Sequence, residues 1–344
     1  TGVQTCALPI SATKRTLQET HMSDYATSYG TSASPTEGNG GQADTKWKRV
    51  ESLGLVVSFI LMIIMNILSN AVCGVGKDPV CKNNGQQSND NPTYITPDGF
   101  TFAIWGLIYI FELCYTVYQA LPVQRGGGFG QKTLDGSRKY VIAAFLLNGL
   151  WLILFSFSLW WLSEVVILAY LYCIAKTYDE LQVNWFSQVD RNGAKVTVAY
   201  KLCCYAPWGL QAGWLVVASS LGLSVLGSNN GWTPPPDFGV MIITVATAVA
   251  SYLAITRNDL FYAFITCWAL QGIIRAQNSA PVDGSKTQLP KSWEIIHWAT
   301  TGFYVLIVAT AIGVVRAVMN RNTPVRMERA HRHEQGDAME RPLV

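Results

Sequence analysis

The sequence predicts an all-α fold in the form of a polytopic membrane helix bundle. Half of its 344 residues are hydrophobic and only 14% are charged, whereas soluble domains carry about 25% charged residues. The apolar residues gather in runs of the length needed to cross a bilayer as a helix, about 20 residues. These features exclude a disordered chain, a disulfide scaffold and a typical cytosolic enzyme. The net charge of +3 is too small to indicate a nucleic-acid partner.

Eight apolar runs define the predicted spans. Short breaks separate the third run from the fourth, at Trp160–Ser163, and the sixth from the seventh, at Thr256–Asp259. Because either break could lie inside one helix, seven spans is the alternative. The runs cover residues 52–73, 99–121, 140–160, 163–181, 198–226, 239–256, 259–275 and 294–317.

The distribution of basic residues predicts the orientation of these spans. With the N-terminus inside, 20 of the 25 Lys and Arg residues fall on inner segments and 5 on outer segments. Cytoplasmic loops of membrane proteins carry such an excess of positive charge. The split favours an even number of spans, with both termini cytoplasmic. Nothing in the sequence indicates which membrane holds the protein.

Both ends of the chain are predicted to lie outside the bundle. Residues 1–21 open with TGVQTCALPI, which resembles a translated sequencing adaptor, so we expect the natural chain to start at Met22. A short polar leader is the alternative. Residues 22–50 and 318–344 are too polar to fold alone and are predicted to be disordered tails, the second of them basic.

Cysteine usage gives one open question. Cys73 and Cys81 flank the first outer loop, where an oxidising compartment would allow a disulfide and a reducing one would leave two thiols. The other cysteines of the spans are expected to pack as small apolar side chains. No Cys/His cluster has zinc spacing. We therefore predict no metal site.

Motifs for catalysis are missing from the sequence. It contains no GxxxxGK[ST] phosphate loop, no HExxH zinc motif and no GxSxG elbow. No convincing pair of nucleophile and base is apparent either. We therefore predict no catalytic residues, and an enzyme acting on a lipid or tetrapyrrole ranks last among the possible functions.

Polar and aromatic side chains share faces on three of the predicted spans. Trp105, Tyr109 and Glu112 lie at i, i+4 and i+7, on one face of the second span. An isolated carboxylate near the middle of the membrane is costly and points to function; a hydrogen-bonded structural Glu is the alternative. Asn148, Trp151 and Phe155 predict a similar stripe on the third span.

The fifth span adds a proline, two tryptophans and a glutamine to these stripes. Aromatic walls with a few polar groups are typical of a small-molecule pocket, although such stripes also serve helix packing. The predicted ligand-binding residues are Pro97, Trp105, Tyr109, Glu112, Asn148, Trp151, Phe155, Pro207, Trp208, Gln211 and Trp214. Gly209 and Gly213 have GxxxG spacing, which supports either packing inside the chain or pairing in a homo-oligomer.

Three of these segments resemble the TspO/MBR family, the translocator or tryptophan-rich sensory proteins. TPDGFTFAIWGLIY carries Pro97, Trp105 and Tyr109 of the family's second-helix signature. LNGLW followed by Phe155 is similar to the N-x-x-W-x-x-x-F pattern of helix three, and APWGLQAGW resembles the Pro-aromatic start of helix five. The resemblance covers about residues 50–226, within a chain that holds 12 Trp.

The resemblance implies a TspO-like five-helix core at residues 51–226, followed by additional transmembrane helices at 227–317. It also implies a tetrapyrrole or sterol ligand, with porphyrin or haem bound as ligand; no other cofactor is indicated. Gln211 stands where the family usually has Trp, and the added spans indicate an enlarged eukaryotic-type member. We therefore predict a protein that binds or carries a hydrophobic small molecule. The alternative is a proton-coupled transporter or channel that uses Glu112.

Overall fold

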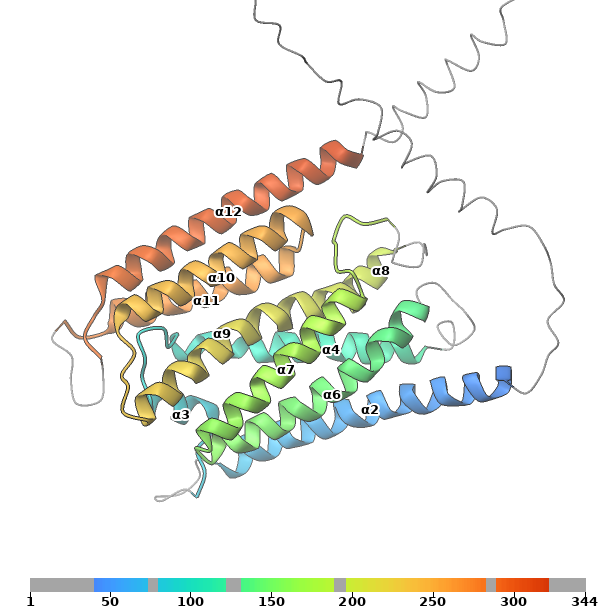
Figure 1. Cartoon of the computed structure of the whole chain (residues 1–344), viewed down its shortest axis with the longest axis horizontal. Coiled ribbons are helices and arrows are strands. Elements are labelled where there is room, and N and C mark those ends of the chain that lie inside the picture. The colour runs from blue at the N-terminus through green and yellow to red at the C-terminus, as the bar shows by residue number, and fades with distance from the viewer. Residues whose placement is uncertain (1–39, 74–79, 122–130, 189–195, 283–288, 322–344) are drawn as a thin grey trace, which may run out of the picture. The chain divides into compact units, whose positions relative to one another are not determined.

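The computed structural model describes residues 40–73, 80–121, 131–188, 196–282 and 289–321. The predicted leader, the residues before Gly40 in the N-terminal tail, and the C-terminal tail beyond Arg321 lie outside the described residues. Contacts divide the chain into two units, Thr1–Trp47 and Lys48–Val344. The second unit contains the helix bundle described below (Figure 1).

All regular structure in the described ranges is helical, as the composition predicts. The short elements η2 and η3 are a 3₁₀ turn and a π turn. The elements are α2 (Gly40–Val72), α3 (Asn84–Asp90), η2 (Gly99–Ala103), α4 (Ile104–Ala120), α6 (Gln131–Ser156), α7 (Trp160–Glu180), α8 (Val198–Tyr200), η3 (Lys201–Tyr205), α9 (Ala206–Asn229), α10 (Pro236–Thr256), α11 (Leu260–Ser279) and α12 (Trp293–Arg321).

Seven helical segments of the described chain are long and apolar enough to cross a membrane. They are Arg49–Val72, Gly99–Ala120, Thr133–Ser156, Trp160–Glu180, Val198–Asn229, Pro236–Thr256 and Trp293–Met319. The remaining predicted run, the seventh at residues 259–275, forms helix α11, which carries Gln271, Arg275 and Gln277 in its second half and is therefore less apolar. The chain is an integral membrane protein with a helical bundle.

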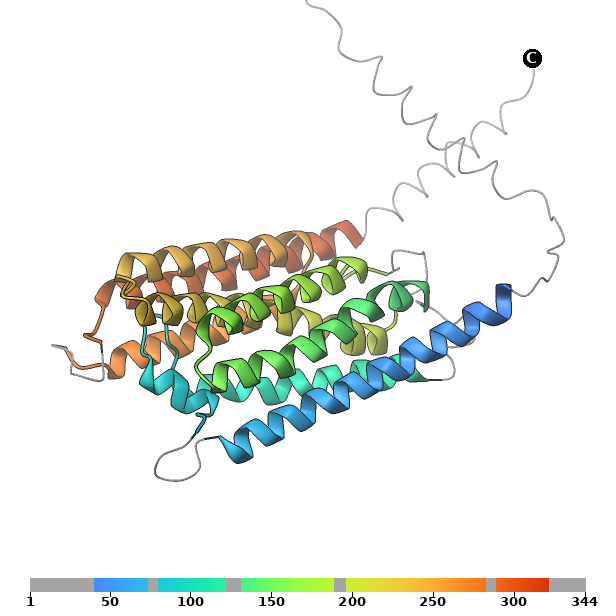
Figure 2. The ribbon, with the colours of Figure 1, turned by 60° about the horizontal axis from the view of Figure 1, so that its bottom comes forward.

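Helix α9 lies in the middle of the second unit. The α6–α7 hairpin packs along one side of α9, and α11 packs along the other, followed by α10 and α12 (Figures 1 and 2). This placement explains why the first half of α9, Ala206–Leu215, is buried on all sides, with both tryptophans Trp208 and Trp214 inaccessible to solvent. A helix that is apolar all round belongs in the centre of a bundle.

One of the two predicted hairpin breaks is displaced in the structure. The sequence places the first break at Trp160–Ser163, but α7 already begins at Trp160, and the turn is formed by residues 157–159 with Ser158 at φ 58°. The side-chain amide of Gln87 explains this position, because it donates to the carbonyls of Phe155 and Ser156 (3.0 and 3.1 Å) and ends α6 there. The prediction was wrong because this capping group comes from a distant segment.

The second break, Thr256–Asp259, is confirmed. Helix α10 ends at Thr256, Asn258 takes φ 52°, and Asp259 caps α11 by accepting from the amides of Phe261 and Tyr262, both at 3.0 Å. Asp259 also accepts from the Tyr178 hydroxyl at 2.8 Å. These three bonds satisfy a carboxylate that is only 2% exposed, and burial raises its pKa above the usual range for Asp.

The GxxxG pair of α9 packs against α11 inside the chain. A side chain at Gly209 would meet the carboxylate of Asp259, with the added Cβ 2.7 Å from Oδ1, and one at Gly213 would overlap Ile265. Small residues at helix seams permit this kind of close approach. The seam is therefore used for internal packing, and a homo-oligomer stays a prediction.

A disulfide joins Cys73, just beyond the end of α2, to Cys81, ahead of α3. It settles the choice between a disulfide and two thiols. The backbone amide of Lys82 then donates to the carbonyl of Ser156 at 3.0 Å, and Asn91 accepts from Asn229 at the end of α9 (3.0 Å). The short helix α3 is thus fastened to the ends of α2, α6 and α9.

Candidate functional site

A pocket between α3, α4, α6 and α9 contains five of the predicted ligand-binding residues. We call it the aromatic pocket. It is lined by Asn84, Ser88, Pro97, Phe102, Trp105, Trp151, Phe155, Trp214, Val217, Ala218, Leu221 and Gly222. Its cavity volume is about 30 Å³, which is about the volume that one water molecule occupies in the liquid. The rings therefore nearly fill the pocket in this conformation.

The aromatic rings form a ladder along one wall of the pocket. Trp105 stacks on Tyr109 with ring centroids 5.5 Å apart and faces Trp151 at 6.0 Å. Trp151 continues to Phe155 at 5.3 Å. Trp214 meets the edge of Trp105 at 6.0 Å from the α9 side. The aromatic stripes of the second and third spans thus face one another, as a shared pocket requires.

Helix α11 positions the segment that leads into η2 and α4, and this segment includes the lining residue Pro97. The backbone amide of Asp98 donates to the carbonyl of Gly272 (3.0 Å), and its carboxylate pairs with Arg275 at 3.1 Å. The indole of Trp268 donates to the Thr101 carbonyl at 2.9 Å. One of the additional helices therefore holds a wall of the pocket in place.

A chain of hydrogen bonds runs behind the ladder and joins α4, α2, α6 and α7. The Tyr109 hydroxyl donates to Asn66 Oδ1 (2.8 Å), and Asn66 Nδ2 donates to Asn148 Oδ1 (2.9 Å). Asn148 Nδ2 donates to the Tyr170 hydroxyl at 3.2 Å. Asn148 is therefore a buried group with partners, and it fixes the face of α6 that carries Trp151.

Glu112 and Gln211 are the least satisfied polar groups near the centre of the bundle. Both are 0% exposed, and neither the carboxyl oxygens of Glu112 nor the amide atoms of Gln211 have a hydrogen-bond partner among the described residues. Glu112 is close enough to Tyr109 and Tyr170 to interact with both electrostatically. A buried polar atom without a partner costs about 1–3 kcal/mol. Such groups are candidates for contact with a proton, an ion or a ligand.

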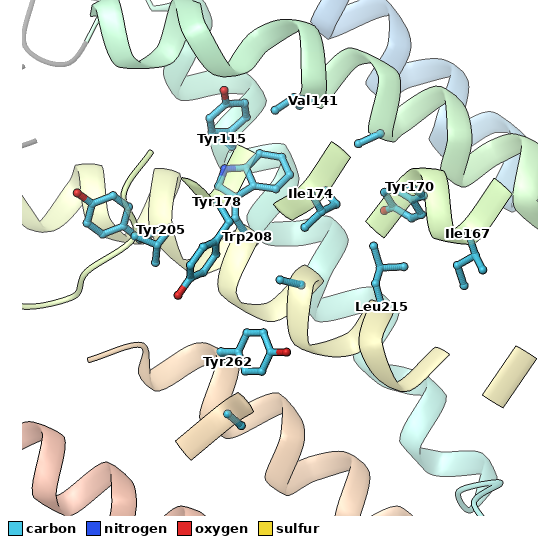
Figure 3. Packing of buried hydrophobic residues seen from close by; sticks show 14 of the residues in the cluster. Tyr115, Val141, Ile167, Tyr170, Ile174, Tyr178, Tyr205, Trp208, Leu215 and Tyr262 are labelled. Carbon is cyan, nitrogen blue, oxygen red and sulfur yellow. The ribbon is translucent and has the colours of Figure 1, made fainter. Parts of the chain in front are cut away.

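Six of the eleven predicted residues do not line the aromatic pocket. They are Tyr109, Glu112, Asn148 and Gln211, described above, and Pro207 and Trp208 at the start of α9. Trp208 packs edge-on against Tyr115, with ring centroids 4.8 Å apart (Figure 3), and lies 6.4 Å from Phe145. Pro207 follows the π turn η3 at the start of α9; because proline lacks an N–H, it disturbs regular helical bonding at that point. Pro207 and Trp208 therefore shape the core rather than line the pocket.

The sequence reasoning missed several lining residues. Phe102 lies one turn before Trp105, and Ala218 and Gly222 continue the Trp214 face of α9 at i+4 and i+8, so periodicity offered a signal for them. Asn84 and Ser88 offered none, because they belong to a polar loop in the sequence. Their place in the pocket depends on where α3 folds back.

The family model described as TSPO-like protein matches residues 52–318 of this chain. The match extends across the five-helix segment and the added helices α10, α11 and α12 alike. The search of curated proteins and the search of solved structures gave no match. With an apolar helix bundle and a family match over most of its length, the chain belongs to the TSPO-like protein family.

Proposed function

We propose that the protein binds or carries a flat hydrophobic molecule of the tetrapyrrole or sterol class in the aromatic pocket. The supporting observation is the ladder of Trp105, Trp151 and Phe155, which meets Trp214 around one cavity. Stacked rings present large apolar surfaces to a planar partner. Helix α3 would supply the polar side of the pocket, through Asn84 and Ser88.

Ligand size sets a condition on this proposal. Pockets for drug-sized molecules measure about 300–1,000 Å³, whereas this cavity holds about 30 Å³. Binding must therefore separate rings of the ladder or lift α3 from the ends of α6 and α9. A ligand-induced change in tryptophan emission is the expected signature, because at least three indoles surround the cavity.

The test is tryptophan-fluorescence quenching of the purified full chain by a porphyrin. We expect saturable quenching at micromolar porphyrin, and a roughly two- to tenfold weaker affinity in Trp151→Phe, since an aromatic contact contributes about 0.5–1.5 kcal/mol. Trp298→Phe on the exposed face of α12 is the matched control and should bind like the wild type. Equal affinities in both variants, or no saturable binding, would exclude the tetrapyrrole pocket.

A second candidate function rests on Glu112, as a proton-coupled transporter or channel. Its two buried oxygens without partners can take up and release a proton without breaking a described hydrogen bond. Glu112→Gln keeps the shape of the side chain and removes the titrating group. Substrate-driven proton flux into vesicles should then be abolished, whereas Glu294→Gln at the exposed start of α12 should leave it intact. Unchanged flux in the Glu112 variant rules this role out.

The orientation predicted from basic residues is part of the proposal. With both termini cytoplasmic, α3 and the Cys73–Cys81 disulfide lie on the opposite side of the membrane, where oxidising conditions favour disulfides. The aromatic pocket then opens toward that side beneath α3. Accessibility of Lys82 to an impermeant amine reagent in intact vesicles tests this orientation.

A further inference from the structure

Glu164 is a buried carboxyl group beside the aromatic pocket that the proposed function does not use. It lies in the second turn of α7 and is 6% exposed. Its Oε2 has no hydrogen-bond partner within the described ranges. The ion pairs of the described chain all use other carboxylates, namely Asp90, Asp98, Asp135 and Asp179.

The carboxyl group of Glu164 rests on the bare backbone of Gly222, which lines the aromatic pocket. A Cβ at Gly222 would overlap Oε2 and come within 3.5 Å of Cδ. Any side chain there would therefore displace the carboxyl group from its contact with Gly222, although Glu164 itself is not a lining residue of the closed pocket. The glycine is what allows an acidic side chain from α7 to reach this face of α9.

A second acceptor lies at the same end of the pocket. The Oδ1 of Asn84 on α3 is buried without a described partner, and Asn84 lines the cavity. Asn91, just after α3, accepts from Asn229 at the end of α9 (3.0 Å). The later residues of α9, including Gly222, therefore lie toward α3, whereas Trp214 lies deeper.

Both unpartnered atoms are acceptors, so a ligand must supply the donors. A hydroxyl would satisfy one of them, but a carboxylate next to the cavity favours a positively charged donor, because charge-assisted hydrogen bonds are about twice as strong as neutral ones. The aromatic ladder requires a flat body, and a cation over tryptophan rings gains further attraction. A ligand that turned a carboxylate toward this end of the pocket would meet Glu164 with like charge.

We infer that Glu164 and Asn84 favour, among the flat ligands of the aromatic pocket, those that present a hydrogen-bond-donating nitrogen, such as an amine or amidine, at the α3 end when the pocket opens. This inference rests on the proposed function, since it names the ligand chemistry of the same pocket. It assigns recognition to a residue of α7 and a residue of α3, next to the ring ladder of α4 and α6.

The experiment compares two probes of the same shape on the full chain in phosphatidylcholine nanodiscs. The probes are 9-aminoacridine and acridine-9-carboxylate, and empty nanodiscs correct for partition into lipid. We expect the amine to bind at least about tenfold more tightly than the carboxylate, as a charge-assisted hydrogen bond allows. In Glu164→Gln the preference should fall about tenfold, and in Glu294→Gln it should stay at the wild-type value.

Gly222→Ala supplies an independent variant, because it leaves Glu164 in the sequence and displaces its carboxyl group from Gly222. It should lose the preference for the amine as Glu164→Gln does. Equal binding of the two probes in the wild type, or an unchanged preference in Glu164→Gln, would overturn the inference. Binding of neither probe and no porphyrin would instead refute the aromatic pocket itself, so the two failures are distinguishable.

Discussion

Two buried polar regions of this bundle differ in how completely they are bonded. The Arg138 cluster, formed by Ser52, Gln119, Asp135 and Arg138, joins α2, α4 and α6. Gln119 Oε1 accepts from Ser52 at 3.0 Å and from Arg138 Nε at 3.2 Å, while Arg138 pairs with Asp135. Near the centre of the bundle, in contrast, the side chains of Glu112 and Gln211 and the indole of the pocket residue Trp214 lack described partners.

This difference distinguishes buried polar groups that stabilise the fold from buried polar groups that are available to a ligand or a proton. A fully bonded buried network stabilises one arrangement of helices, and the Arg138 cluster fits that description. Unbonded buried atoms lower stability. Several such atoms in the centre of the bundle are what a protein would need if a ligand or a proton completes their bonding. The comparison makes three predictions about variants.

The largest expected effect is on stability, from Arg138→Met. The substitution removes a cation that is 2% exposed and leaves the Asp135 carboxylate without it. Breaking a buried pair costs about 3–5 kcal/mol, and unfolding of the detergent-purified protein measures the loss. Lys139→Met, on the exposed face of the same turn, is the control and should change stability by less than about 0.5 kcal/mol. Similar values for both variants would contradict a structural role for the cluster.

An intermediate effect distinguishes two buried glutamines of equal exposure. Gln119→Leu removes the acceptor of Ser52 and Arg138 and should lower the free energy of unfolding by about 2 kcal/mol. Gln211→Leu removes no described bond and relieves a desolvation penalty, so stability should stay the same or rise by about 1 kcal/mol. The same unfolding assay measures both. A destabilised Gln211 variant would mean that its amide is already bonded in the native protein.

The smallest expected effect concerns the seam between α9 and α11. Gly209→Ala would press a methyl group against the Asp259 carboxylate, which is fully bonded, and should cost about 1–2 kcal/mol. Gly106→Ala in α4 is the matched control, because its added Cβ meets nothing within 4 Å. That control should stabilise by about 0.5–1 kcal/mol through helix propensity. An unchanged stability of Gly209→Ala would show that α9 and α11 can move apart at this contact without loss of stability.

Much of the fold was predictable because membrane insertion is a local property of the chain. Length and hydropathy placed a helix at each of the eight apolar runs, and seven of them meet the requirements of a span. The faces of the helices followed from the spacing of Trp105 with Tyr109 and of Trp151 with Phe155. The family resemblance was confirmed as well.

Periodicity alone determines which side chains share a face, but not which helix that face meets. Only the tertiary structure turned Trp208 toward Tyr115 and away from the pocket, and brought Asn84 into it. Only it showed that Glu112 and Gln211 have no hydrogen-bond partner within the described part of the chain, while Asn148 does. The physical reason is that hydrogen bonds and ring contacts between helices depend on packing between distant segments. Hydropathy and helical spacing, in contrast, are set by residues close together in the sequence.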